Sequence, residues 1–351
     1  MGELSNESVA LTVTSPPYPM IEMWDGIFEN QNKLIGTCLS NNEGDAAFEL
    51  MHQEMDKVWD ELWRVTRPGG IVCINIGDAT RTINGEFKLY ANHSRILSHC
   101  VNIGFSNLPN ILWKKQTNAP NKFMGSGMLP GGAYVTLEHE HILIFRKGRK
   151  REFVTAEDKH NRQETAFFWE ERNKWFSDTW DLKGAKQKME DGGSRNRSGA
   201  FPFELAYRLI NMYSVKGDTV LDPFLGTGTT TFAAIASGRN SVGYEIDTAL
   251  SETVSSFFDD KLLENLNNYT RRRILNHLDF VSERIAKKGE EAFKHENVGY
   301  DFPVMTKQER EIIINFLSSI EKIDDNLIQA NYITEPVMDT FRKESLFAKA
   351  S

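Results

Sequence analysis

Short apolar runs alternate with amphipathic stretches over the first 250 residues of the chain, and this rhythm predicts its secondary structure. Apolar runs rich in β-branched residues indicate buried strands, and apolar positions at helical spacing indicate helices. The predicted strands are 9–13, 71–76, 111–113, 141–145, 219–221 and 241–244. The predicted helices are 45–66, 89–103, 202–213 and 232–237, and 19–42 is a long loop or short helix. Strands alternating with helices predict an α/β fold with a parallel sheet.

The first predicted strand ends in the segment Thr14–Tyr18, which is rigid enough to hold a ligand. Consecutive prolines cannot continue a hydrogen-bonded ladder, so the chain leaves the strand in a fixed, extended corner. There the Ser15 hydroxyl and the Pro16 carbonyl can accept two hydrogen bonds from an amino group. The Tyr18 ring can stack on the planar group that carries the amine. A proline turn that only caps the strand is the alternative, and a Pro-Pro pair alone favours that alternative. The candidate catalytic residues are Ser15, Pro16, Pro17 and Tyr18.

A second motif, DPFLGTGTT over 222–230, joins a strand, a glycine turn and a helix start. Free backbone amides at such a helix start face a ligand. The motif lacks the lysine of a phosphate-binding loop, and Thr231 stands where a dinucleotide fingerprint needs glycine. Asp222 at the strand tip would repel a pyrophosphate, but it suits a ligand with an ammonium and a sulfonium. Glu245, at the tip of the next strand, can accept hydrogen bonds from ribose hydroxyls. These features predict S-adenosylmethionine rather than NAD or ATP.

Composition and motif spacing exclude several classes of protein. Apolar content of 40% and charged content of 26% are those of an ordinary soluble protein. The chain has no 18-residue apolar run, and its first residues lack the features of a signal peptide. The three cysteines, Cys38, Cys73 and Cys100, form no CxxC pair, which predicts a reduced, cytoplasmic protein without structural disulfides.

Charge singles out the segment 146–197, although the net charge of the whole chain is −8. This segment has 14 basic against 10 acidic residues, opens with the basic run 146–151 and carries six Phe or Trp residues between 167 and 180. A basic run alone usually marks a solvated surface. Basic residues interleaved with aromatic residues instead favour a nucleic-acid surface. The candidate DNA-binding residues are Arg149, Lys150, Arg151, Arg195 and Arg197.

The stretch Glu138–His141 has one feature of a metal site. His139 and His141 are two residues apart, so they share one face of a strand and could ligate an ion. No third ligand stands at a recognisable spacing, and the remaining histidines are scattered along the chain. The sequence therefore favours a structural role at the strand entry and predicts no metal.

With both motifs present, the chain resembles the DNA amino-methyltransferases of the permuted, beta-type order. In that family an (S/D/N)PPY motif precedes the recognition segment, and the cofactor motif comes last. The resemblance covers about residues 9–250 and rests on further segments beyond the two motifs. These segments are Arg67–Gly70, Ile111–Lys114, Glu140–Lys147, Asp178–Trp180 and Phe201-Pro202. The implied cofactor-binding residues are Thr14, Phe201, Asp222, Pro223, Phe224, Gly226, Gly228, Thr229, Thr230 and Glu245.

The chain departs from the family pattern at two places. The family usually has a further strand and a Gly-Asp pair ahead of the catalytic strand, where this chain has Met1–Leu4. Either the start is truncated or the adenine pocket is built differently. The family's common His before the Phe-Pro step is also missing, since Arg197–Ala200 stands in its place.

The resemblance implies a Rossmann-like methyltransferase sheet and four segments. These are the catalytic half over 1–145, a target-recognition insert over 146–197, the cofactor-binding half over 198–260 and a helical appendage over 261–351.

The implied reaction moves a methyl group from S-adenosylmethionine to the exocyclic amine of a base flipped out of duplex DNA. Hydrogen bonds to Ser15 and the Pro16 carbonyl would free the amine lone pair, and alignment can supply up to ~7–11 kcal/mol. SPPY is similar to the cytosine N4 enzymes, whereas adenine-modifying relatives usually carry Asp at the position of Ser15. Transfer to cytosine N4 is therefore expected, within a restriction-modification system whose endonuclease acts on the same site. The alternatives are adenine N6 methylation, an inactive DNA-binding subunit, and methylation of RNA or a small molecule. The basic aromatic segment favours a polymer over a small molecule as substrate.

Overall fold

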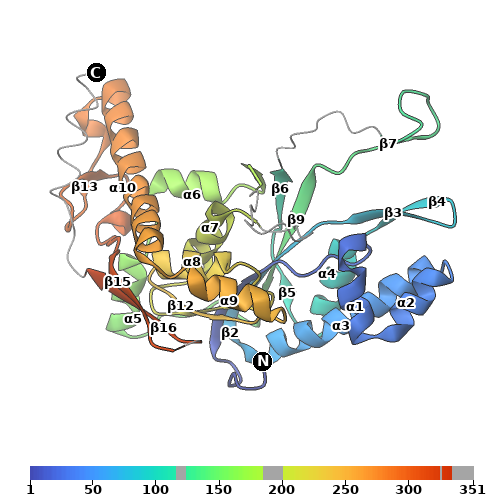
Figure 1. Ribbon diagram of the computed structural model, residues 1–351. Helices are drawn as coiled ribbons and strands as arrows, with labels where there is room; N and C mark the ends of the chain where they lie inside the picture. The colour runs from blue at the N-terminus through green and yellow to red at the C-terminus, as the bar shows by residue number, and fades with distance from the viewer. Residues whose placement is uncertain (116–123, 185–200, 325, 334–351) are drawn as a thin grey trace. The chain divides into compact units, whose positions relative to one another are not determined.

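The computed structural model describes residues 1–115, 124–184, 201–324 and 326–333 (Figure 1). These residues belong to two compact units. Unit 1 is Met1–Arg151, Asp178–Leu205 and Leu221–Phe224, and unit 2 is Glu152–Ser177, Ala206–Val220 and Leu225–Ser351. No helix in the described ranges is long and apolar enough to cross a membrane.

A mixed sheet forms the centre of unit 1, with the strand order β10-β6-β9-β2-β1-β11 and with β5 beside β9. Its strands are β1 (Val9–Thr14), β2 (Thr66–Ile76), β5 (Ser106–Asn107), β6 (Ile111–Lys115), β9 (His139–Arg146), β10 (Thr179–Leu182) and β11 (Thr219–Asp222). All six residues of β1 are buried, and so are Ile71–Ile76 of β2. Such continuous apolar runs are typical of strands covered on both faces. The strands predicted from the apolar runs are confirmed.

The predicted parallel arrangement is wrong for one strand. β1 pairs with β2, and β6 with β10, in the parallel sense. β9 runs antiparallel to both β2 and β6. The chain between β6 and β9 contains the hairpin strands β7 (Met124–Gly125) and β8 (Ala133–Tyr134) and no helix among its described residues. Without a helical crossover the returning strand pairs antiparallel with its predecessor.

Four helices pack together in unit 1 (Figure 1). They are α1 (Asp25–Gln31), α2 (Lys33–Ser40), α3 (Gly44–Val65) and α4 (Asn92–Asn102). The predicted helices over 45–66 and 89–103 correspond to α3 and α4, and the stretch 19–42 holds α1, α2 and a 3-10 turn rather than one loop. α3 buries Met51, Met55, Trp59 and Leu62, which recur at helical spacing.

Two hairpins that the periodicity did not predict extend from unit 1 (Figure 1). The first is made of β3 (Ala79–Ile83) and β4 (Glu86–Tyr90), and the second is β7–β8. The Phe87 ring stacks on the Tyr134 ring with their centroids 4.4 Å apart, so the two hairpins contact each other. Large apolar side chains at the second hairpin are exposed, including Met128 at 87% and Val135 at 85%.

Unit 2 combines short helices, one long helix and small sheets. Its helices include α5 (Ala156–Glu164), α6 (Trp169–Trp175), α8 (Thr229–Ala236), α9 (Thr248–Ser256) and α10 (Asp260–Lys288), and α7 (Phe203–Tyr213) enters it from unit 1. Its strands are β12 (Asn240–Gly243), β13 (His295–Glu296), β14 (Pro303–Val304), β15 (Phe316–Lys322) and β16 (Ile328–Ile333). The prediction of a helical segment after residue 260 is therefore correct for α10 and wrong for the strands that follow.

The described part of the predicted insert over 146–197 is divided between the two units. Residues 146–151 and 178–184 belong to unit 1, and 152–177 belong to unit 2. In unit 2 the Phe168 ring stacks on His277 of α10 at 3.9 Å, and Glu171 forms an ion pair with Arg273 of α10 at 2.6 Å. Phe168 also joins a buried cluster with Tyr300, Phe302 and Ile314. Several aromatic residues of this segment thus fill a core because burying such large rings is favourable.

Candidate active site

Strand direction and side-chain alternation bring the first motif together with three residues from other strands. β1, β2 and β6 end at the same edge of the sheet, where the antiparallel β9 begins. Thr14 lies beside Ile74, which places Ser15 next to Asn75. Asn75 pairs with Ile142, two residues from Glu140, so both side chains lie on one face.

Glu140 is the centre of a hydrogen-bond network around the Thr14–Tyr18 segment. Its Oε2 accepts from the Tyr18 hydroxyl at 2.8 Å and from Asn75 Nδ2 at 2.6 Å. Its Oε1 accepts from Lys115 Nζ. Ser15 Oγ lies 3.2 Å from the Tyr18 hydroxyl and 3.4 Å from Asn75 Nδ2. The glutamate is 7% exposed, and the ammonium beside it balances the buried carboxylate.

The Tyr18 ring is fixed both by its hydroxyl and by the backbone beneath it. Burial and the neighbouring Glu140 carboxylate raise the pKa of Tyr18 well above its ordinary value, so this phenol keeps its proton at neutral pH. A Cβ added at Gly77 would lie 2.9 Å from Cε2 of the ring, so the ring can occupy this position only beside glycine. The sequence singled out Ser15 and Tyr18 as candidates, but it did not single out Asn75, Lys115 or Glu140, which form one hydrogen-bond network with them in the structure.

Thr14 links the first motif to the second within unit 1. Its hydroxyl donates to Asp222 Oδ1 at 2.6 Å, and Phe224 N donates to the same oxygen at 3.1 Å. Thr14 and Asp222 are 0% and 2% exposed. Two donors hold the carboxylate at the end of β11, and charge-assisted hydrogen bonds of this kind are strong. Thr14 therefore positions Asp222.

The glycine turn and Glu245 belong to unit 2. Gly226 and Gly228 have φ angles of +55° and +81°, which favour glycine and allow the sharp turn before α8. Glu245 Oε2 accepts from Gly226 N at 2.8 Å, and its Oε1 accepts from Asp247 N at 2.9 Å. A carboxylate has about four acceptor sites, so Glu245 can also accept from hydroxyl groups of a ligand.

The remaining candidates for the cofactor differ in exposure. Phe201 is 6% exposed, and the Phe224 ring packs edge-on against Trp59 with centroids 6.1 Å apart. Thr230 is buried, whereas Pro223 and Thr229 are half-buried. Pro16 is buried beside the half-buried Pro17.

The basic residues predicted to bind DNA are not brought to the Ser15 edge of the sheet. Arg146 pairs with Ile71 in the middle of β2, whereas His141 pairs with Ile76 at its end. Arg149 and Lys150 are exposed and follow Arg146, so they lie beyond the opposite edge. Arg195 and Arg197 lie outside the described residues.

Three possible metal ligands meet in unit 1, although the sequence predicted no third ligand. Ligand atoms of Asp78, His93 and His141 all lie within 4.8 Å of one another. His93 Nδ1 is 2.8 Å from the Asp78 carboxylate, and its ring stacks on the His141 ring at 3.9 Å. Burial and the neighbouring His93 lower the pKa of His141 to about 4. Residue spacing could not reveal this group because Asp78, His93 and His141 come from three separate segments.

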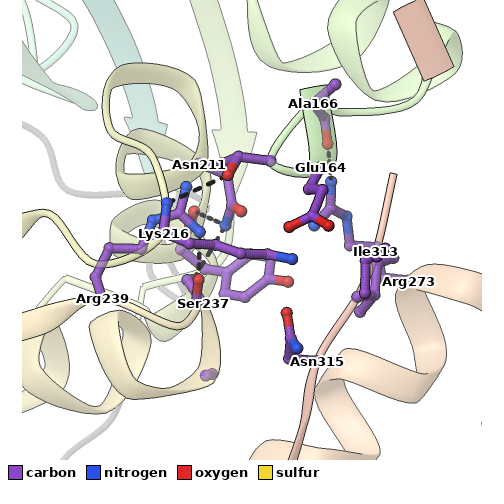
Figure 2. Close-up of a pocket in the computed structure, with 13 residues that line it drawn as sticks. Glu164, Ala166, Asn211, Lys216, Ser237, Arg239, Arg273, Ile313 and Asn315 are labelled. Atoms are coloured by element: carbon purple, nitrogen blue, oxygen red, sulfur yellow. Dashed lines mark hydrogen bonds between the residues drawn. The ribbon is translucent and has the colours of Figure 1, made fainter. Parts of the chain in front are cut away.

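Unit 2 contains a polar pocket that none of the predicted site residues lines (Figure 2). Lys216, Arg239, Arg273 and Glu164 supply charged side chains to its wall. Burial, together with Arg239 and Arg273, lowers the pKa of Lys216 to about 8 even though Glu164 opposes the shift. Arg239, in the turn between α8 and β12, donates to the carbonyls of Ser214 and Ser237, which secures this turn to the ends of α7 and α8.

Comparison with known proteins agrees with this arrangement of motifs. A family model described as DNA methylase, covering N6 and N4 amino-methyltransferases, matches residues 9–255. The type II methyltransferase M.MthZI of Methanothermobacter thermautotrophicus is 50% identical over 334 residues, which cover 95% of this chain and 92% of that protein. M.MjaI of Methanocaldococcus jannaschii is 52% identical over 268 residues, which cover 72% and 86% of the two chains.

A solved structure shares the fold over most of its length. It is a protein of Thermus thermophilus assigned as a DNA modification methylase and determined with S-adenosyl-L-methionine bound. It is 30% identical with a TM-score of 0.56, and the match covers 73% of this chain and 87% of that one. The family match and the extent of these relatives show that the chain belongs to the N6/N4 DNA methylase family.

Proposed function

We propose that this protein is a type II DNA methyltransferase that transfers the methyl group of S-adenosylmethionine to N4 of cytosine in duplex DNA. The observation that carries the proposal is the pair of adjacent residues at the end of β1. Thr14 holds the Asp222 carboxylate, and Ser15 belongs to the Glu140 network. One strand end therefore connects the acidic group expected to bind the cofactor with the hydroxyl expected to bind the target amine.

S-adenosylmethionine is the cofactor, and the residues of this chain fit its groups. Asp222 carries a negative charge that suits the ammonium, and Glu245 can accept hydrogen bonds from the ribose hydroxyls. The turn at Gly226 and Gly228 lets the backbone approach a ligand without a side chain in the way. When bound, the cofactor supplies an electrophilic methyl group on a sulfonium.

The chain's own residues prepare the amine to accept that methyl group. The lone pair of an exocyclic amine is delocalised into the base, so the amine is a poor nucleophile. Hydrogen bonds from its two N–H groups to Ser15 Oγ and the Pro16 carbonyl favour the pyramidal amine, in which the lone pair is available. The Tyr18 ring stacks on the base, an interaction worth ~1–3 kcal/mol. Removing the base from the duplex is part of binding, because the amine is not accessible in the stack.

Cytosine N4 is proposed over adenine N6 because Ser15 is neutral. A hydroxyl accepts a weaker hydrogen bond than a carboxylate, so Ser15 polarises the amine less than the aspartate of a DPPY motif. The names of M.MthZI and M.MjaI place those relatives among type II methyltransferases. We extend this role to the present chain, together with a restriction endonuclease that acts on the same site.

Mass spectrometry of nucleosides from DNA treated with the protein and S-adenosylmethionine tests the proposal. N4-methylcytosine is the expected product. Ser15→Ala should lower its formation at least tenfold while cofactor affinity in calorimetry stays within twofold of the wild type. N6-methyladenine as the sole product would refute the assignment of the base and would leave membership of the family untouched.

A further inference from the structure

We propose that Glu140 is a positioning residue that makes the Ser15 hydroxyl a hydrogen-bond acceptor towards the target amine. The inference rests on the proposed transfer to an exocyclic amine, and it adds a residue that the motif does not contain. Glu140 lies on β9, 125 residues after Ser15 in the sequence, and it reaches Ser15 through Tyr18.

Counting protons gives the direction of each hydrogen bond in the network. A carboxylate only accepts, so the Tyr18 hydroxyl uses its single proton in the 2.8 Å bond to Glu140. In the 3.2 Å contact between Ser15 and Tyr18, the proton must therefore come from Ser15. The Ser15 proton then points at Tyr18. Of the two lone pairs of Ser15 Oγ, one faces Asn75 Nδ2 at 3.4 Å and the other remains available to accept from an N–H group of the substrate. Ser15 Oγ can bind the amine only when a lone pair, and not its own proton, faces the N–H group.

Asn75 and Lys115 keep the network in this direction. The Asn75 amide nitrogen donates to Glu140 at 2.6 Å and to the Tyr18 hydroxyl at 2.9 Å, so the amide can face the carboxylate only with its NH₂ group. Lys115 binds the other carboxylate oxygen and offsets the cost of burying the charge. Donors of Tyr18, Asn75 and Lys115, from three different segments, all point at Glu140.

Loss of the negative charge would allow the opposite direction. Glutamine at position 140 can donate to Tyr18, and the Tyr18 hydroxyl can then donate to Ser15. The Ser15 proton would turn towards the substrate and face the N–H groups of the amine. Two donors facing each other repel, so the amine would lose one of its two acceptors.

A double-mutant cycle in the full-length protein tests this role. The measurement is the single-turnover rate of radioactive methyl transfer from S-adenosylmethionine to plasmid DNA that the wild type methylates, counted regardless of which base receives the methyl. Glu140→Gln should slow transfer by roughly 10- to 150-fold, as expected for one hydrogen bond that involves a charged group. In the Ser15→Ala background the same change should have an effect of less than threefold, because the hydroxyl that it orients is absent.

Controls separate positioning from folding. Glu138→Gln changes an exposed glutamate two residues away, just ahead of β9, and should leave the rate unchanged. The cofactor affinity and the melting temperature of the Glu140→Gln protein should match those of the wild type. Because Glu140→Gln leaves Lys115 without its carboxylate partner, the double variant Glu140→Gln/Lys115→Met repeats the rate measurement with this lysine removed. Tyr18→Phe, which keeps the ring and breaks the chain of hydroxyls, should slow transfer as Glu140→Gln does.

Three results would overturn the inference. The first is a transfer rate in Glu140→Gln equal to that of the wild type. The second is a double variant whose rate loss equals the product of the losses in Glu140→Gln and Ser15→Ala. The third is a fall in the cofactor affinity of Glu140→Gln that is large enough to account for its slower transfer. Methylation of adenine instead of cytosine would refute only the assignment of the base, since the cycle counts every methyl group transferred.

Discussion

At the scale of single residues, Thr12 and Thr14 form a natural comparison on β1. Both are 0% exposed, but Thr14 donates to Asp222, whereas Thr12 Oγ1 has no hydrogen-bond partner among the described residues. Thr14→Val keeps the branched shape and removes the donor, leaving the Asp222 carboxylate less firmly held. Loss of a hydrogen bond to a charged group costs roughly 1.5–3 kcal/mol. Cofactor affinity in calorimetry should therefore fall at least tenfold.

Thr12→Val is the matched control for that experiment. It replaces a buried hydroxyl that makes no hydrogen bond to the described residues, so cofactor affinity should stay within twofold and stability should hold or rise. Equal affinities for the Thr14→Val and Thr12→Val proteins would show that Thr14 does not position Asp222 for the cofactor.

Some residues around Ser15 can be predicted from local sequence, and others cannot. Ser15, Tyr18 and Asp222 can be identified because the proline corner and the glycine turn have local chemical consequences. The sequence draws attention to Glu140 beside a possible metal site at His139 and His141 and as the first residue of a segment that carries the family resemblance, but neither gives it a role beside Ser15. Alternation along β9 places Glu140 on the side of Ser15 and the two histidines on the other face. Which side faces Ser15 depends on the register with β2, and that register cannot be obtained from β9 alone.

At the scale of elements, the packing of α3 on α4 contains a buried histidine that makes unit 1 sensitive to acid. His52 of α3 is 0% exposed and contacts the Asn92 amide of α4 at 3.0 Å. Burial is the main cause that lowers the pKa of His52 to about 4, although the hydrogen bond to Asn92 opposes it. The unfolded chain binds a proton below pH ~6.5, whereas the folded chain does so only near 4. Stability is therefore complete above pH ~6.5 and decreases as the pH falls towards 4.

This difference predicts a loss of roughly 2 kcal/mol between pH 7.5 and pH 5 from His52 alone. Thermal denaturation across that range should show a falling midpoint, and His52→Gln should weaken the dependence because glutamine does not titrate. His160→Gln, at a side chain that is 63% exposed, should keep the wild-type dependence on pH. An identical pH dependence in the His52→Gln and wild-type proteins would contradict the assignment.

Most elements of the sheet were predictable, whereas their directions were not. The strands β1, β2, β6, β9 and β11 and the helices α3, α4 and α7 follow from apolar periodicity. The antiparallel β9 depends on what connects it to β6, and its direction brings Glu140 to the edge where Ser15 lies. β3–β4 and β7–β8 were missed because β3 and β4 show no alternation of buried and exposed positions, and β7 and β8 have only two residues each.

At the scale of the whole molecule, composition was a poor guide to where the aromatic side chains of the segment 146–197 lie. Its aromatic residues were expected on a DNA surface, but Phe168 and Trp175 are buried in unit 2 and Trp180 is buried in unit 1. A window of sequence that is rich in aromatic residues describes a core as well as it describes a surface that stacks on bases. Whether such a residue is buried or exposed depends on the segment that packs against it. For Phe168 this segment is α10, whose His277 is more than 100 residues later in the sequence.

The basic run 149–151 follows the end of β9 that lies away from Ser15. Arg146 is five residue steps from His141 along β9, a distance of about 17 Å. The run is therefore at the edge of the sheet away from Ser15.

We expect that changing Arg149, Lys150 and Arg151 together to alanine leaves DNA affinity within threefold of the wild type. The slope of affinity against salt concentration should also persist. If the run does bind phosphates, as its composition suggested, the slope should instead fall by about one unit for each phosphate that is no longer neutralised. Titrating a labelled duplex at several salt concentrations distinguishes these outcomes, and Lys114→Ala, at an exposed lysine beside the Ser15 edge, is the comparison expected to lower the slope.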